Sequence, residues 1–193
     1  AIGGTPSDCV MLGLRQLAPG HIDVLVSGIN LGPNVGRDIP YSGTVMATLQ
    51  GYYRKIPSIA VSILNLSREE SYDFTVAGHF IRSLVEQIQS GKMKLDAILN
   101  VNLPNLPREK IKGVRTTRTA STGYVNLSAQ KQAGGVKYAL ELGTGLRDNL
   151  EEDTDIWAIH HGYISVTPLQ FNITEKETML PLRNSMEQME GWR

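Results

Sequence analysis

The sequence predicts an α/β protein built on an open, mostly parallel β-sheet. Up to residue 110, short apolar runs rich in β-branched residues alternate with segments whose apolar positions follow a helical period. Glycine and proline residues separate the two kinds of segment, as they do at the turns of such folds. Beyond residue 111 the predicted strands are joined by Gly- and Gln-bearing turns with no helix between them. We therefore divide the chain into a core portion, 1–110, and a β-rich extension, 111–193.

The first helix is predicted to begin at Thr5-Pro6-Ser7-Asp8. Thr5 can cap the helix, Pro6 suits the first helical position, and Asp8 stands where a capping box needs an acceptor. An apolar stripe follows, and Pro19-Gly20 ends the helix. The compact apolar run Ile22–Val26 comes next and predicts a buried parallel strand.

The segment after this strand carries Ser27-Gly28-Ile29-Asn30 and then a loop, Leu31–Tyr41, that is crowded with Gly, Pro and Asn. Ser42-Gly43-Thr44 opens the next helix. Long ordered loops in compact domains tend to be functional, which favours a role for both flanking motifs. The later elements are predicted as strands at 59–63, 97–103, 111–119, 123–127, 136–142 and 163–169, and as helices at 72–90 and 175–189, the last interrupted or kinked by Pro181.

The composition bounds the classes of function. The 193 residues carry 19 basic and 19 acidic side chains, which disfavours a nucleic-acid polymer or a membrane surface as a partner. The apolar fraction of 41% is enough for one sizeable core, and no apolar run reaches the ~18 residues that span a bilayer. Cys9 is the single cysteine, so an intrachain disulfide is impossible and a cytoplasmic location is the simplest expectation.

Asn30 is the first candidate ligand-binding residue. In open α/β sheets, ligands bind beyond the carboxyl ends of the strands, and Asn30 follows the predicted strand at 22–26. Its carbonyl oxygen suits a hard cation such as Mg²⁺ or Mn²⁺, and its amide group suits a phosphate. The alternative is that Asn30 only hydrogen-bonds the loop that follows it.

The helix start at Ser42-Gly43-Thr44 is the second candidate. A helix N-terminus leaves several N–H groups unpaired and carries a partial positive charge, so it attracts phosphate. Gly43 lets an anion approach the backbone closely, while Ser42 and Thr44 add hydroxyl donors. The alternative is an ordinary serine N-cap. Gly3-Gly4-Thr5-Pro6 is a further glycine-bearing helix start that could meet the same edge of the sheet.

His160-His161 follows an acidic stretch at 151–155. Histidines and carboxylates can bind a metal or transfer protons. On a strand, adjacent histidines would point to opposite faces, which disfavours a joint pair of ligands. We favour a solvated loop with an interface salt bridge.

The order and spacing of several short motifs, taken together, resemble the SurE family of survival-protein nucleotidases. The resemblance runs over nearly the whole chain, although each motif alone is short. The matching segments are 4–10 (GTPSDCV), 26–30 (VSGIN), 32–36 (GPNVG), 41–45 (YSGTV), 98–104 (ILNVNLP) and 162–169 (GYISVTPL).

This resemblance implies a Rossmann-like α/β core whose swapped β-hairpin and C-terminal helix, within residues 111–193, assemble a homodimer or homotetramer. It implies a metal-dependent phosphomonoester hydrolase, a 5′-nucleotidase or acid phosphatase acting on nucleoside 5′- and 3′-monophosphates. The implied cofactor is a divalent metal, Mg²⁺ or Mn²⁺.

The resemblance also assigns individual residues. Asn30 matches the asparagine that ligates the metal. Ser42-Gly43-Thr44 matches the phosphate-side turn, where Ser42 and Thr44 have the catalytic task of stabilising the transferring phosphoryl group. Asn34 lies in the loop above that turn, and Thr5 belongs to a segment close to it.

Two departures from the family pattern leave alternatives open. Arg37-Asp38 stands where many members carry two acidic residues. Members also begin with a strand ending in two aspartates that ligate the metal, and we expect this chain to lack that segment. One asparagine alone should bind a divalent ion poorly. A non-catalytic nucleotide- or anion-binding module is therefore the alternative function, and a third possibility is that residues 111–193 serve mainly in assembly.

Overall fold

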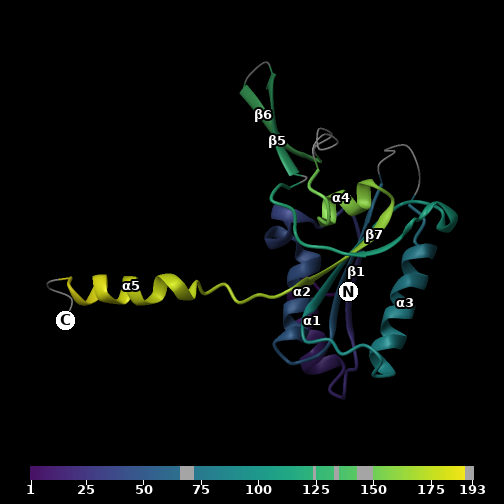
Figure 1. Cartoon of the computed structure of the whole chain (residues 1–193), viewed down its shortest axis with the longest axis horizontal. Coiled ribbons are helices and arrows are strands. Elements are labelled where there is room, and N and C mark those ends of the chain that lie inside the picture. Colours follow the sequence, from purple (N-terminus) through teal and green to yellow (C-terminus); the bar gives the residue numbers. More distant parts are fainter. Residues whose placement is uncertain (66–71, 124, 133–134, 143–149, 190–193) are drawn as a thin grey trace.

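A five-stranded sheet forms the centre of the molecule (Figure 1). The structure, a computed structural model, describes residues 1–65, 72–123, 125–132, 135–142 and 150–189. The strand order is β1-β2-β3-β7-β4, and only the β3–β7 pair is antiparallel, which confirms the predicted open, mostly parallel sheet. The strands are β1 (Leu25–Leu31), β2 (Ser58–Leu64), β3 (Ile98–Pro104), β7 (Tyr163–Leu169) and β4 (Gly113–Thr116).

Helices cover both faces of the sheet, with α1 and α2 on one side and α3 on the other (Figure 1). Helix α3 shows how the sequence dictates this: its buried residues Ala77, Ile81 and Leu84 recur at helical spacing and pack on Val61 and Val101. The helices are α1 (Pro6–Leu12, continued by a π-helical turn, Gly13–Leu17), α2 (Gly43–Tyr52), α3 (Thr75–Gln89), α4 (Asp155–His160) and α5 (Lys176–Glu187). None of the described helices is long and apolar enough to cross a membrane.

The first strand lies later in the chain than predicted. It begins at Leu25 rather than Ile22, and Ser27-Gly28-Ile29-Asn30 lies within it rather than beyond its end. The reason is pairing with β2, which runs from Leu25 opposite Ser58 to Asn30 opposite Ser62, across a register shift. Backbone pairing therefore continues through small and polar residues whose composition suggested the end of a strand.

Three other predictions needed correction. The loop at 31–41 contains a 3-10 helix, Gly36–Tyr41, with Pro40 inside it. The helix predicted from residue 72 begins at Thr75, whose N–H donates to Asp73 Oδ1 at 2.8 Å. The solvated loop predicted for His160-His161 is wrong, because His160 ends α4 and His161 is its C-cap. A six-residue helix is too short for its period to stand out in the sequence.

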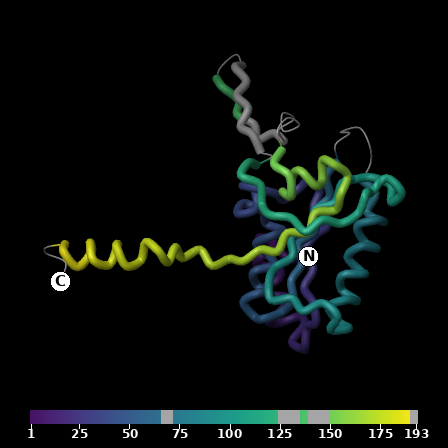
Figure 2. The backbone as a smooth tube through the Cα atoms, in the orientation of Figure 1, coloured from purple at the N-terminus to yellow at the C-terminus, as the bar shows by residue number. Residues whose placement is uncertain are grey.

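The extension contains two elements that project from the body (Figure 2). One is the hairpin of β5 (Val125–Gln132) and β6 (Gly135–Leu142), which pair antiparallel along their whole length. The other is α5, which runs through Pro181 and has no buried residue. The sheet itself crosses the boundary proposed at residue 110, because β4 and β7 lie beyond it. The division of the chain at that point stays a prediction.

Candidate functional site

Helix α2 places its N-terminus over the carboxyl end of β1. A Cβ atom at Gly51, near the other end of the helix, would lie 3.1 Å from a methyl group of Leu25, the first residue of β1. The ten residues of α2 span about 15 Å. The five steps from Leu25 to Asn30 cover about 16 Å. The turn at 42–44 and Asn30 therefore lie at the same end of the sheet.

They also lie on the same face of the sheet. Val45 of α2 packs against Ala60 and Ile98 in one apolar cluster. Ser62 follows Ala60 by two positions on β2, so it points to that same face, and Asn30 is its partner on β1. The arrangement that the sequence predicted, a helix start above a polar strand end, is present.

The first turn of α2 offers backbone donors to an anion. The Val45 N–H donates to Ser42 Oγ at 3.1 Å, and the Met46 N–H donates to the Ser42 carbonyl at 2.8 Å. The N–H groups of Gly43 and Thr44 have no acceptor within the helix, because they belong to its first turn. Gly43 is exposed and Thr44 is half-buried, so both can be reached from solvent. Ser42 itself is buried and acts as the N-cap, as the simpler interpretation expected, and its part in binding phosphate and in catalysis stays a prediction.

Asn30 uses its amide group locally and leaves its carbonyl oxygen available. Its Nδ2 donates to the Gly32 carbonyl at 2.8 Å, as the simpler interpretation expected. Among the described residues, no donor bonds to Asn30 Oδ1. That oxygen is a hard neutral ligand of the kind Mg²⁺ and Mn²⁺ accept.

Asn34 is fixed onto the sheet through its backbone. Its N–H donates to Asn102 Oδ1 at 2.8 Å, and its carbonyl accepts from Asn100 Nδ2 at 2.8 Å and Asn102 Nδ2 at 3.1 Å. Its side-chain amide donates to Ser62 Oγ. Asn34 is therefore buried and rigid, and it ties the loop after β1 to the ends of β2 and β3.

These contacts belong to a band of polar side chains buried across the sheet. Thr117 Oγ1 is 2.8 Å from Ser165 Oγ and 2.7 Å from Thr167 Oγ1, and Thr167 lies opposite Asn100 in the β3–β7 pair. Asn100 Oδ1 is buried without a hydrogen-bond partner among the described residues. Buried polar groups are usually paired, so the band is an unusual feature of an otherwise apolar layer.

Thr5 lies near the phosphate-side turn, but its donors already have a partner. A Cβ atom on Gly43 would be 3.1 Å from the Pro6 ring, so the starts of α1 and α2 are neighbours. The N–H and hydroxyl of Thr5 donate to Asp8 Oδ2 at 2.8 and 2.7 Å, which completes the predicted capping box. The Thr5 N–H, followed by the Thr5 hydroxyl, lowers the pKa of Asp8. Thr5 as a phosphate ligand stays a prediction, and a carboxylate lies beside it.

The histidines do not form a metal site with other described residues. His161 stacks on Trp157 with ring centroids 4.3 Å apart, and its Nδ1 is 2.8 Å from the Trp157 carbonyl. Burial, followed by the nearby His161, lowers the pKa of His160. No three His, Cys, Asp or Glu side chains among the described residues converge on a point that could hold a metal ion. Glu151 of the acidic stretch pairs with Arg118 of the same chain at 2.8 Å, and the interface salt bridge stays a prediction.

Four residues of this region escaped the analysis of the sequence: Ser62, Asn100, Asn102 and Asp155. Asn100 and Asn102 did leave a signal, because polar residues alternate with apolar ones in the run Ile98–Pro104. Asp155 left none, since it stood in an acidic stretch typical of a solvated loop. It is buried, and burial raises its pKa while N–H groups of Gly36, Ala120 and Ile156 oppose that rise.

Comparison with known proteins agrees with the fold. The family model described as "Survival protein SurE" matches residues 1–126. Proteins named 5′-nucleotidase SurE from Syntrophomonas wolfei and Pelotomaculum thermopropionicum are 40% and 38% identical, over 97% of this chain and 70% of their own lengths. The crystal structure of the SurE protein from Aquifex aeolicus superposes with a TM-score of 0.77 at 37% identity, covering 96% of this chain and 74% of that one.

The open sheet, with helices on both faces and a helix start at its carboxyl edge, defines a Rossmann-like α/β protein. Within that class, the chain belongs to the SurE family.

Proposed function

We propose that this protein hydrolyses phosphomonoesters, with nucleoside 5′-monophosphates, and also 3′-monophosphates, as its substrates. Relatives at 34–40% identity carry the name 5′-nucleotidase, which supports this class of reaction. The observation that carries the proposal is the start of α2, where the N–H groups of Gly43 and Thr44, which have no acceptor among the described residues, lie on the same face and at the same end of the sheet as Asn30.

The phosphate is proposed to sit on this helix start. The N–H groups of Gly43 and Thr44 and the hydroxyl of Thr44 donate to its oxygens, and the helix dipole adds a favourable field. Ser42 holds these donors in place through its cap to Val45. Such fixed donors stabilise charge that develops during phosphoryl transfer without reorganising, which is the largest contribution to catalysis in reactions of this kind.

We further propose a divalent cation, Mg²⁺ or Mn²⁺, with Asn30 Oδ1 as one ligand. The free carbonyl oxygen fits such an ion, but the described residues supply no carboxylate cluster to balance its charge. The described residues therefore do not complete a metal site, and the other ligands of the ion have to come from residues outside the described ones.

The absence of a carboxylate cluster among the described residues favours a second candidate function, a nucleotide- or anion-binding module without turnover. The two are separated by measuring phosphate release from adenosine 5′-monophosphate and p-nitrophenyl phosphate, with Mn²⁺ or with a chelator, beside binding of the same nucleotide. Metal-dependent release that Asn30→Ala cuts sharply supports the hydrolase. Binding without release supports the module. Neither binding nor release contradicts both.

The projecting elements are proposed to join copies of the chain in a homodimer or homotetramer. Leu180 and Leu182 of α5 are 63% and 52% exposed, and Tyr138 of the hairpin is 65% exposed. Apolar side chains on an isolated helix are expected to find a partner surface. Removal of residues 176–193 should lower the molar mass measured by light scattering, and an unchanged mass would contradict a role for α5.

A further inference from the structure

Asp155 is a buried carboxylate that joins three separate segments. Its Oδ2 accepts from the Gly36 N–H at 2.8 Å, and its Oδ1 accepts from the Ala120 N–H at 2.9 Å and the Ile156 N–H at 2.8 Å. Its exposed fraction is 0%, and no Lys, Arg or His side chain among the described residues pairs with it. Backbone N–H groups, together with its place in the first turn of α4, therefore compensate its charge.

Burying the Asp155 carboxylate costs free energy, so its presence in the core needs an explanation. Burying a carboxylate without a cation loses several kcal/mol of hydration, only part of which hydrogen bonds restore. The raised pKa of Asp155 has the same origin, since burial is its first cause. An asparagine or serine at the start of α4 would cap the helix without that cost, and Thr154 already performs the cap by accepting from the Trp157 N–H.

The N–H groups of Gly36 and Ala120 show which segments the Asp155 carboxylate holds together. Gly36 begins the 3-10 helix that leads into the phosphate-side turn, and Ala120 precedes the β5–β6 hairpin. These segments dock backbone to backbone, because the Arg37 N–H donates to the Thr122 carbonyl at 3.0 Å. A Cβ atom on Gly36, where φ is +51°, would collide with that same carbonyl.

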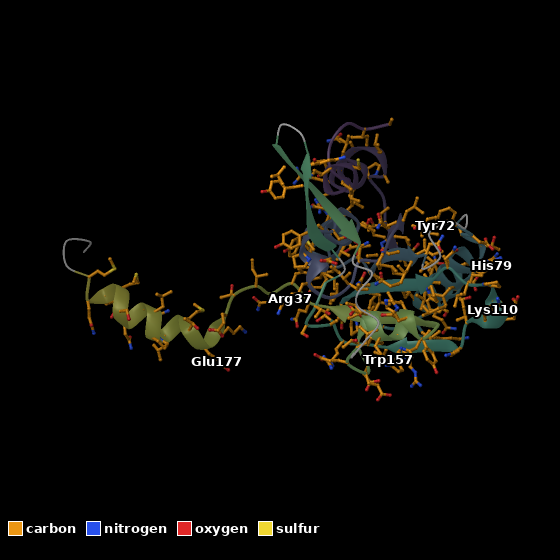
Figure 3. All side chains as sticks on the ribbon, turned by 90° about the horizontal axis from the view of Figure 1, so that it is seen from above. Arg37, Tyr72, His79, Lys110, Trp157 and Glu177 are labelled. Carbon is orange, nitrogen blue, oxygen red and sulfur yellow. The ribbon has the colours of Figure 1, made fainter. Side chains whose placement is uncertain are left out.

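The docked segment completes the support of the site loop. Asn102 fixes one end of the loop through Asn34, and the Ser42 cap fixes the other end. Between these points, Asp155 holds the loop at Gly36 by accepting from its N–H. In Figure 3, Arg37 lies on the side of the body from which α5 projects, whereas His79 of α3 lies on the opposite side.

We propose that Asp155 is a positioning residue: it anchors the loop at 32–41 to the base of the hairpin and thereby sets the place of the phosphate donors at the start of α2. The inference rests on the proposed phosphate site. Displacements of about 1 Å in a positioned donor can cost a hundredfold in rate, so the loss of this anchor is expected to weaken ligand binding as well as stability.

The test compares Asp155→Asn with Leu84→Ala in the full chain. The asparagine keeps the shape but turns an amide N–H₂ toward one of the backbone donors. Leu84 is buried in α3 and packs in a cluster that contains no residue of the loop at 32–41, so its truncation lowers stability without touching the anchor. Gly36→Ala, which breaks the same docking from the loop side, is the second variant in case Asp155→Asn does not fold.

Two measurements are made at a temperature at which each variant is folded by circular dichroism. Amide hydrogen exchange should speed up at 32–41 in Asp155→Asn and Gly36→Ala but not in Leu84→Ala. The Kd for inorganic phosphate should rise about tenfold or more in the first two variants only. Unchanged exchange at 32–41, or an equal Kd in all three variants, overturns the inference. If the unmodified chain binds no phosphate, the proposed function fails instead, and the exchange result still decides whether the anchor exists.

Discussion

The body of the molecule and its projecting elements are stabilised in different ways. In the body, apolar strands and helix faces are buried, and even polar groups such as Asn34 and Asp155 are enclosed and hydrogen-bonded. In α5, no residue is buried, and a proline lies inside the helix. A helix of this kind is held by local hydrogen bonds alone, which are marginal for twelve residues in water. The comparison teaches that packing fixes the site, whereas α5 has no such packing within the described part of the chain.

The largest expected effect is on the free energy of unfolding, because side chains are packed in the body and not in α5. Ile59→Ala, at a fully buried position of β2, should lower the free energy of unfolding by about 2–5 kcal/mol, because it removes buried contacts and leaves a cavity. Leu180→Ala, on α5, should change it by less than about 0.5 kcal/mol. Urea unfolding of both variants at a concentration where the protein is monomeric checks this. Equal losses would contradict the distinction.

A smaller effect compares the caps of two helices. Ser42→Ala should cost about 1 kcal/mol, because the Val45 N–H loses its acceptor at a buried helix start. Glu175 caps α5 by accepting from the Glu177 N–H at 2.9 Å, yet Glu175→Ala should leave the global unfolding midpoint unchanged, since α5 is not part of the body. Thermal unfolding followed in the near ultraviolet reports the body. A shift in Glu175→Ala as large as that in Ser42→Ala would show that α5 is coupled to it.

The smallest effect is the dependence of the free energy of unfolding on pH, and it again arises in the body. The pKa of His160 is lowered from 6.5, first by burial. The unfolded chain therefore binds more protons than the folded one just below pH 6.5, so the free energy of unfolding falls as the pH decreases through that window. His160→Gln should flatten this slope between pH 7 and the folded-state pKa. Denaturant unfolding across that range measures it, and an unchanged slope would remove His160 as its source.

The sequence was most informative where local chemistry decides the structure. The capping box of Thr5 and Asp8, the Ser42 helix start and the strand at Tyr163–Leu169 all lie where their residues predicted. Each depends on contacts within a few residues, or on a two-residue period, so a single stretch of sequence contains the information.

The parts that could not be predicted depend on contacts between distant segments. The shifted bounds of β1 follow from pairing with β2, more than thirty residues away. Asp155 resembles a surface acid in its own stretch, and only the folded chain brings Gly36 and Ala120 to its oxygens. The band formed by Asn100 and its neighbours was visible as an alternation of polar residues, but its partner Asn34 lies 66 positions earlier in the chain.

The central claim is that the start of α2 binds phosphate, and a pair of matched variants tests it most directly. Thr44→Val removes a half-buried hydroxyl from the first turn, and Thr48→Val makes the same change one turn further on, where the hydroxyl bonds the Val45 carbonyl. Titration calorimetry with inorganic phosphate should give a Kd raised about tenfold to a hundredfold for Thr44→Val, the loss of one hydrogen bond to a charged group. It should give an unchanged Kd for Thr48→Val. Equal affinities in the unmodified chain and in Thr44→Val would contradict the account.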